Sequence, residues 1–200
     1  AKVRHSRLCG GDAGVKFTSK GGKPVSESFF ALIADIGGTH ARFALVDEAG
    51  RPGEPMVMRC ADHAGPARAA QAFLAAHGNG IRVGRAAFAV ASPITGDAVD
   101  RTNSAWHFSI AQVRRELGLE RLDVINDFTA VALSVRHLGP EHLLKVGGGV
   151  AADGAPIAVL GPGTGLGVSA LVPDSSGRWT ALATEGGHVT LAAANAQEDA

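Results

Sequence analysis

The sequence predicts an α/β fold, in which a mixed β-sheet begins as a three-strand antiparallel meander and carries helices on both faces. Short apolar segments follow one another closely between residues 29 and 60, which is the spacing of a meander. A helix-like segment then leads to a buried strand-like one, the order of a parallel crossover. Helix-like and strand-like segments alternate again up to residue 135, as they do in proteins whose helices pack on a sheet.

The first two strands enclose a glycine turn. The apolar run 29–33 reaches Asp35, turns through Gly37, Gly38 and Thr39, and resumes as a strand. Glycines at such a turn permit positive φ and close approach of a ligand, and the exposed amide N–H groups favour an anion. The stretch predicts a phosphate-holding hairpin with Asp35 facing a metal, although an ordinary tight turn explains it equally well.

The next elements complete the meander and start the crossover. A third strand is expected over 56–60 and a helix over 66–77. A buried strand over 86–91 follows and is expected to be parallel to the first. It ends in the turn 92–97, at the edge where open α/β sheets bind their ligands.

A second helix and strand lead to a conspicuous polar pair. Ser109 is expected to cap a helix that stops at Gly118. A short strand over 122–125 then runs into a helix that begins at Asn126 or Asp127. Both residues therefore lie at a strand-to-helix junction.

The last third of the chain repeats the hairpin pattern. Strands over 157–160 and 168–172 enclose a glycine-rich turn that contains Thr164 and Gly165. A further strand over 179–183 ends in the segment Glu185-Gly186-Gly187-His188.

Composition limits the classes of function. The formal net charge of +0 argues against nucleic-acid or membrane-surface binding by bulk electrostatics. With two cysteines, Cys9 and Cys60, no disulfide framework is implied, which favours a reducing cytoplasm. No apolar run approaches the roughly 20 residues that span a bilayer. A soluble, cytoplasmic protein is expected.

Residues 1–28 differ from the rest, with six basic residues against two acidic ones and no periodicity. Because this segment lacks an apolar core, it does not fit a secretory signal. We interpret it as a disordered leader or upstream extension; an organelle transit peptide is an alternative, but no amphipathic helix supports it.

Four polar spots lie at strand ends or tight turns, and together they suggest phosphoryl transfer to a polyol. The two Gly-Thr turns suit phosphates, whereas the pairs Asn126/Asp127 and Glu185/His188 suit hydroxyl groups. Phosphoryl transfer needs positioning, charge neutralisation and a carboxylate that accepts the alcohol proton, and Asp127 is the natural base. Taken locally, Asp127 is also a good N-cap, a role compatible with catalysis.

Other chemistries fit less well. The Glu-x-x-His spacing of residues 185–188 occurs in helical di-metal sites, but two adjacent glycines cost a helix about 2 kcal/mol, so we expect a loop there. No Walker-type phosphate loop is present. Residues 165–170 match a loose dinucleotide fingerprint, but Pro173 ends the segment where a helix is required.

In these segments the chain resembles the bacterial glucokinase family, a group of sugar kinases that share the actin-like (ribonuclease H-like) fold. The matching segments occur in the family's order: ADIGGTHARFAL (34–45), ASPITGD (91–97), TNSAWHFS (102–109), INDFTAVAL (125–133), GPGTGLGVSALV (161–172) and EGGHV (185–189).

The resemblance implies ATP-dependent phosphorylation of glucose at its 6-hydroxyl, with Mg²⁺. It implies that Asp127 is the base, that Asn126, Glu185 and His188 contact the sugar, and that Asp35 binds Mg²⁺ through water. The phosphate-binding residues would be Asp35, Gly37, Gly38, Thr39, Thr164 and Gly165. Asn103, with Trp106, falls in a motif near the sugar cleft.

The resemblance also sets expectations for the whole protein. Residues 29–136 would form a small domain, and 137–200 a linker and the start of a larger, incomplete one. His40 replaces the family's usual Asn. We expect this chain to be the amino-terminal part of a glucokinase, inactive alone and homodimeric at full length. The alternative is a non-catalytic sugar-sensing regulator, but residues 1–28 are too irregular for the DNA-binding helix-turn-helix that such proteins carry.

Overall fold

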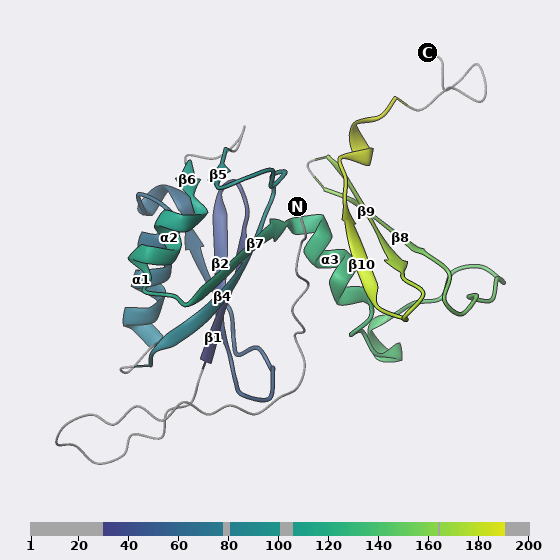
Figure 1. Cartoon of the computed structure of the whole chain (residues 1–200), viewed down its shortest axis with the longest axis horizontal. Helices are drawn as coiled ribbons and strands as arrows, with labels where there is room; N and C mark the ends of the chain where they lie inside the picture. The colour runs from purple at the N-terminus through teal and green to yellow at the C-terminus, as the bar shows by residue number, and fades with distance from the viewer. Residues whose placement is uncertain (1–29, 78–80, 101–105, 164, 191–200) are drawn as a thin grey trace.

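The larger of the two main sheets organises the amino-terminal half of the chain (Figure 1). The computed structural model describes residues 30–77, 81–100, 106–163 and 165–190, so the expected leader 1–28 lies outside the described residues. The sheet has five strands in the order β3-β2-β1-β4-β7, with bounds β1 Phe30–Ile36, β2 His40–Val46, β3 Met56–Arg59, β4 Val83–Val90 and β7 Arg121–Asn126.

The directions of the first four strands are those expected from the sequence. β1, β2 and β3 pair antiparallel as a meander, whereas β4 and β7 run parallel to β1. The third strand is shorter than predicted, because Cys60 begins a 3₁₀ turn over Cys60–Asp62. A small ribbon of β5 (Ala98–Val99) and β6 (Phe108–Ser109) lies beside this sheet.

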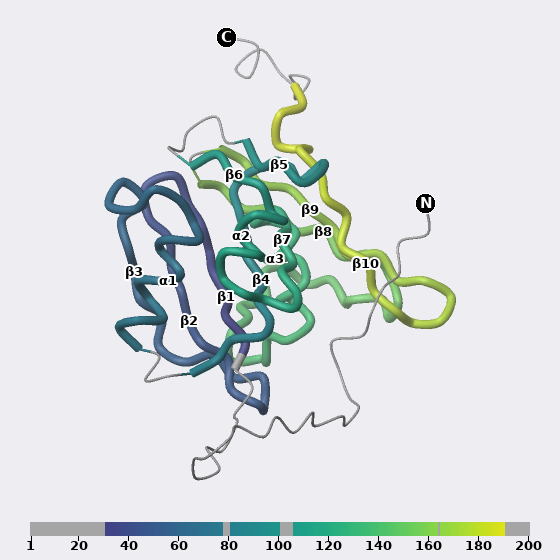
Figure 2. The backbone as a smooth tube through the Cα atoms, turned by 60° about the vertical axis from the view of Figure 1, so that its left-hand side comes forward, coloured from purple at the N-terminus to yellow at the C-terminus, as the bar shows by residue number. Residues whose placement is uncertain are grey.

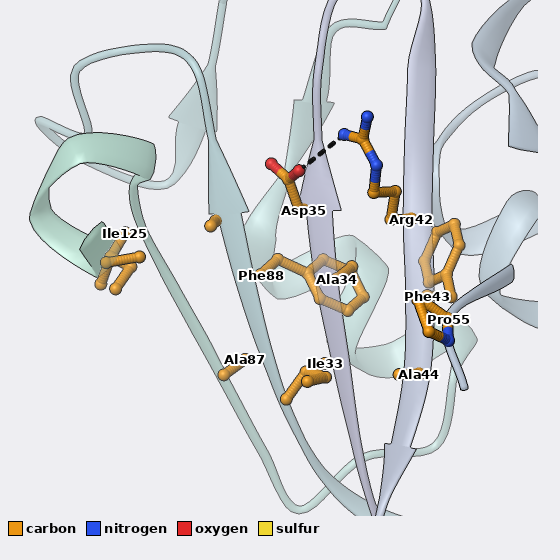
Figure 3. Close-up of a pocket in the computed structure, with 12 residues that line it drawn as sticks. Ile33, Ala34, Asp35, Arg42, Phe43, Ala44, Pro55, Ala87, Phe88 and Ile125 are labelled. Carbon is orange, nitrogen blue, oxygen red and sulfur yellow. Dashed lines mark hydrogen bonds and ion pairs between the residues drawn. The ribbon is translucent and has the colours of Figure 1, made fainter. Parts of the chain in front are cut away.

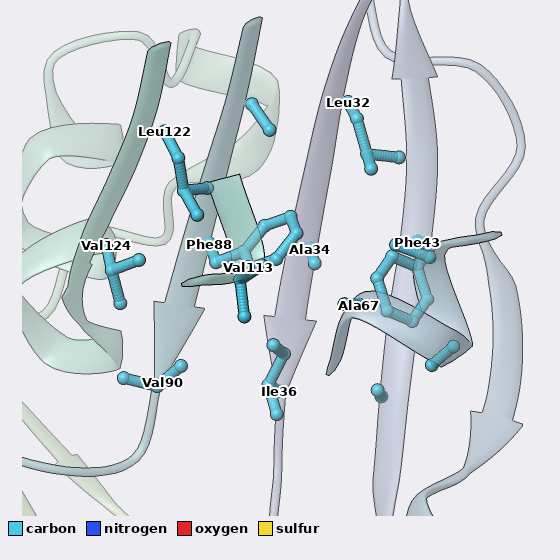
Figure 4. Close-up of a cluster of buried hydrophobic side chains, with 14 of the residues drawn as sticks. Leu32, Ala34, Ile36, Phe43, Ala67, Phe88, Val90, Val113, Leu122 and Val124 are labelled. Carbon is cyan, nitrogen blue, oxygen red and sulfur yellow. The ribbon is translucent and has the colours of Figure 1, made fainter. Parts of the chain in front are cut away.

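Two helices cover one face of the sheet. α1 (Pro66–His77) and α2 (Ile110–Glu116) both pack there, and the predicted Ser109 cap of α2 accepts a hydrogen bond from Gln112 N. Period-2 alternation directs every second strand residue into this core. Phe43 stacks on Phe73 of α1 at 5.8 Å between ring centroids and meets Phe88 edge-on at 6.2 Å. Figure 4 shows the aliphatic side chains that fill the space around these rings.

α3 (Asp127–Val135) connects the first sheet to a second one. It leaves the end of β7 and packs on a three-stranded antiparallel sheet in the order β10-β9-β8, with bounds β8 Ile157–Pro162, β9 Leu166–Pro173 and β10 Trp179–Ala183. The Arg136 guanidinium lies 4.5 Å from the centroid of the Trp179 ring. In Figure 2 the chain runs from β1–β3 on the left, past α3, to β10 on the right.

Single 3₁₀ turns occur at Pro140–His142 and Gly186–His188.

Helices lie on more than one side of the large sheet. α1 and α2 provide most of the cover, and α3 contacts β4 and β7. Within the described residues, no helix is long and apolar enough to cross a bilayer.

Candidate functional site

Two of the four predicted polar spots, together with the 92–97 turn, begin at one edge of the larger sheet. Ile36 of β1 is paired with Val90 of β4, and Val90 is paired with Asn126 of β7. The three strands are parallel, so their carboxyl ends share this edge, where α/β sheets bind ligands. The residues that follow are the first hairpin turn, the 92–97 turn and Asp127. The structure therefore brings the predicted phosphate turn and the predicted base to one side of the sheet.

The first hairpin turn is closed by a backbone hydrogen bond of its own and is also hydrogen-bonded to Cys60. Gly37 N–H donates to the carbonyl of His40 at 2.8 Å. A Cβ at Gly37 would lie 3.0 Å from that same oxygen, so the tight turn leaves little room for a side chain. Cys60 N–H donates to Thr39 O at 2.8 Å, and its thiol lies 3.5 Å from Gly37 O. Gly38 and Thr39 are exposed to solvent.

Asp35 lies just before this turn and forms an ion pair. Arg42, its partner across the β1–β2 ladder, donates from Nη1 to Oδ2 at 2.9 Å. Both side chains are about half exposed, at 53% for Asp35 and 54% for Arg42. Such a pair adds little to stability.

Asp35 also fits the way proteins hold Mg²⁺. Within the described residues, no group of three or more His, Cys, Asp or Glu side chains gathers as a metal cage. Mg²⁺ usually needs only one or two carboxylates, with water and substrate phosphates completing its shell. The ion pair involves one carboxylate oxygen of Asp35, and the other can accept a metal-bound water.

A shallow hollow of about 390 Å³ lies below this ion pair on the sheet face opposite α1 and α2 (Figure 3). Asp35 and Arg42 form one end of it. The rest of its wall is apolar, contributed mostly by Ile33, Ala44, Ala87, Ala89, Ile125 and Ala130, with Phe43 and Phe88. Such a wall offers no partners to hydroxyl or phosphate groups, so it does not suit a sugar or a nucleotide phosphate.

The strand-to-helix junction separates the roles of Asn126 and Asp127. The Asn126 side-chain oxygen accepts from Thr129 N–H at 3.1 Å and caps α3, so the alternative that Asp127 is the cap is wrong. Asp127 is the first residue of the helix and is half-buried. Its Oδ1 accepts from Phe128 N–H at 2.8 Å, which orients the carboxylate. The Asn126 amide nitrogen also lies 3.5 Å from Ser92 O.

The second hairpin is formed by β8 and β9, as the sequence predicts. Gly163 N–H donates to Gly165 O at 2.7 Å and closes the tip. Thr164 lies outside the described residues. The ring of Phe128 packs against Gly161 and Gly167 at the base of this hairpin.

The Glu185–His188 segment forms one 3₁₀ turn, in agreement with the prediction that it is not an α-helix. His188 Nδ1 lies 3.4 Å from Glu185 Oε2, and the two side chains are 82% and 49% exposed. Both groups are accessible to a polar ligand. A Cβ at Gly187 would overlap the carbonyl oxygen of Leu166, which brings the turn directly against the start of β9.

The motif 102–109 is described only in part, because Asn103 lies outside the described residues. Trp106 is 1% exposed, and its Nε1–H donates to the carbonyls of Cys60 and His63 at 3.1 and 2.9 Å. Trp106 therefore supports the segment that holds Thr39.

The 92–97 turn is tied to α2 through Asp97. Its carboxylate accepts from the Ser109 hydroxyl and from Ala111 N–H. These hydrogen bonds, that of Ser109 first, lower the pKa of Asp97 below its ordinary value of 3.8. The loop after β4 is thereby anchored to the start of α2.

Sequence reasoning missed Cys60 and Phe128 as neighbours of the two hairpins. A local signal existed for each: Cys60 is a small apolar residue directly after a short strand, and Phe128 directly follows the predicted base. Neither signal predicts which hairpin the residue contacts, because both contacts join segments far apart in the chain.

Comparisons of the chain with a family profile, with curated sequences and with solved structures all point to glucokinases. The glucokinase family profile matches residues 32–200. The chain is 64% identical to a glucokinase of Paramagnetospirillum magneticum over 86% of its length and 53% of that protein. It is 51% identical to a glucokinase of Aromatoleum aromaticum, covering 86% of the chain and 52% of the relative. The crystal structure of a glucokinase from an Antarctic psychrotroph matches with a TM-score of 0.73 and 36% identity, over 85% of this chain and 54% of that one.

These matches confirm the expected actin-like sugar-kinase fold. The chain spans about half the length of the curated relatives it matches. Because the profile covers nearly everything from β1 onward, the chain belongs to the glucokinase family.

Proposed function

We propose that the protein to which this chain belongs transfers the γ-phosphoryl group of ATP to the 6-hydroxyl of glucose. The observation that carries the proposal is the row formed by Ile36, Val90 and Asn126. It sets the first glycine turn and Asp127 at the same edge of the sheet. A phosphate site and a base at one edge are the parts that phosphoryl transfer requires.

Asp127 is the proposed general base. The sugar oxygen forms a bond to the γ-phosphorus while the bond from that phosphorus to the β–γ bridging oxygen breaks, which yields glucose 6-phosphate and ADP. The hydroxyl proton passes to the Asp127 carboxylate. The hydrogen bond from Phe128 N–H, at 2.8 Å, holds this carboxylate in a defined orientation.

The two hairpins are the proposed phosphate contacts. Gly37, Gly38 and Thr39 would bind through backbone N–H groups and the Thr hydroxyl, and Thr164 and Gly165 would do so from the second hairpin. Asp35 would hold Mg²⁺ through water. When bound, the ion neutralises charge on the phosphates.

The proposed sugar contacts are Asn126, Glu185, His188 and Asn103. The exposed Glu185 and His188 side chains can accept and donate hydrogen bonds to neighbouring hydroxyls. Asn126 would combine sugar binding with its capping of α3.

For the complete protein, we propose ATP as donor, a homodimeric state and a cytoplasmic location, with no nucleic-acid or membrane partner. Residues 29–136 would belong to the smaller domain. Residues 137–200 would link it to the larger one.

A coupled assay of the intact gene product tests the activity. Glucose, fructose and mannose are each supplied with ATP, with polyphosphate and with no donor. We expect ATP-dependent phosphorylation of glucose. Glucose binding without phosphate transfer under any donor would refute the proposal and favour a sugar sensor.

Asp127→Asn tests the base. A positioned base contributes roughly 10²–10⁴-fold to rate, so we expect kcat to fall by that order while glucose affinity is kept. Calorimetric titration with glucose serves as the binding control. Unchanged kcat in the variant would remove Asp127 from the mechanism.

A further inference from the structure

Gly161 and Gly167 together form a socket for the ring of Phe128. They are register partners in the β8–β9 hairpin. A Cβ added to Gly161 would lie 2.7 Å from Phe128 Cζ and 3.0 Å from Cε1. A Cβ added to Gly167 would overlap ring atoms Cε2, Cδ2 and Cζ. The ring therefore occupies the space that side chains at these positions would need.

Backbone conformation does not explain these two glycines. The glycines with positive φ are Gly50, Gly118, Gly147, Gly154 and Gly177, all elsewhere in the described chain. Gly161 and Gly167 adopt conformations open to other residues. What requires glycine here is the close approach of the Phe128 ring.

Phe128 contacts both the proposed base and the second phosphate hairpin. Its backbone N–H donates to the Asp127 carboxylate at 2.8 Å. Its ring rests on the base of the hairpin whose tip is closed by Gly163 and Gly165. One residue thus joins the proposed base to the second phosphate hairpin.

The covalent connection between these two parts cannot set their spacing. α3 and β8 are joined by residues 136–156, none of which is buried. Leu144, Val146 and Val150 in this segment are 88–90% exposed. A connection with so little packing imposes no fixed geometry. The noncovalent contacts of α3 with the second sheet must supply it.

We propose that Phe128 is a positioning residue, which through the Gly161/Gly167 socket sets the distance between the Asp127 carboxylate and the second hairpin. The inference rests on the proposed function. Transfer requires reacting atoms about 3–3.5 Å apart, and a displacement of 1 Å can cost roughly 10²-fold in rate. A side chain in the socket would displace the hairpin by an amount of this order.

The test is a double-mutant cycle in the intact gene product, with Gly167→Ala, Phe128→Ala and the two combined. We expect kcat to fall about 10²-fold in Gly167→Ala and about 10-fold in Phe128→Ala. We expect the double variant to resemble Phe128→Ala, because the ring atoms that the added methyl would overlap are then absent. The KM for glucose should change much less than kcat, because the proposed sugar contact Asn126 lies on the α3 side of the socket. Any rise in KM should come from the Glu185–His188 turn, which packs against the start of β9.

Matched controls separate positioning from general damage. Gly65→Ala adds a methyl where nothing lies within 4 Å, and Val131→Ala truncates a 44% exposed side chain on the same helix. Both should keep wild-type kcat. If Gly167→Ala fails to fold by circular dichroism, Gly161→Ala replaces it in the cycle, because its closest ring contact is milder at 2.7 Å.

The possible results distinguish a failure of the positioning role from a failure of the proposed function. Losses that multiply in the double variant, or a Phe128→Ala variant with lowered Tm but normal kcat, would overturn the positioning role while leaving the proposed function intact. A wild-type protein that binds glucose but transfers no phosphate would overturn the proposed function, and the positioning role with it.

Discussion

Replacing Trp106 tests how the first hairpin is supported. The Trp106 side chain is 1% exposed, and its Nε1–H is shared between Cys60 O at 3.1 Å and His63 O at 2.9 Å. Trp106→Phe keeps a ring in the core but removes the donor. Cys60 O keeps a hydrogen bond from His63 N–H at 3.2 Å, whereas His63 O loses the indole.

The magnitude follows from these contacts. The His63 carbonyl is part-buried, so losing its indole donor should cost about 1 kcal/mol, and the smaller ring leaves unfilled space that adds roughly 1–2 kcal/mol. We expect Trp106→Phe to lower the free energy of unfolding by about 2–3 kcal/mol. Trp106→Ala should cost about 3–5 kcal/mol.

A second effect should appear in catalysis. The Cys60 N–H holds Thr39 O at 2.8 Å, so loosening the 60–63 segment should loosen the first phosphate turn. The KM for ATP should rise more than the KM for glucose. A direct sugar contact by Trp106 would produce the opposite pattern.

The assay is urea unfolding of the intact gene product, followed by circular dichroism because the substitution alters fluorescence. Trp179→Phe is the matched control. It keeps an aromatic ring beneath Arg136, so it should cost less than about 1 kcal/mol. A Trp106→Phe variant no less stable than this control would refute the reasoning.

Two further substitutions test the supports of the site. Asn126→Ala removes the cap of α3 and should lower the free energy of unfolding by about 1 kcal/mol, whereas Asn126→Asp should retain most of it; urea titration compares the two. Asp97 has a pKa lowered by folding, so it stabilises the native state above its ordinary value of 3.8, and this contribution is lost as pH falls through the lower native pKa. Tm measured against pH should therefore fall more steeply in wild type than in Asp97→Asn below that value; parallel curves would contradict the assignment.

Local sequence patterns were sufficient to predict most of the helices and strands. Alternation and turn residues predicted β1, β2 and β4, and the Ser109 cap predicted the start of α2. These features depend on residues within one or two turns of each other, so a sequence window contains their causes. Candidate site residues were also identifiable, because carboxylates and glycines at strand ends stand out against apolar runs.

The sequence by itself determined the order of strands and helices, the meander, the two glycine hairpins and the family. Only the tertiary structure showed that Ile36, Val90 and Asn126 are register partners on adjacent strands. It also showed that Asn126, and not Asp127, caps α3, and that Trp106 is buried. It also decided that Gly161 and Gly167 make room for Phe128. The physical reason is that strand register and steric fit depend on pairs of residues distant in the chain. A local pattern shows that a glycine or an aromatic is present, but the folded chain determines which group it meets.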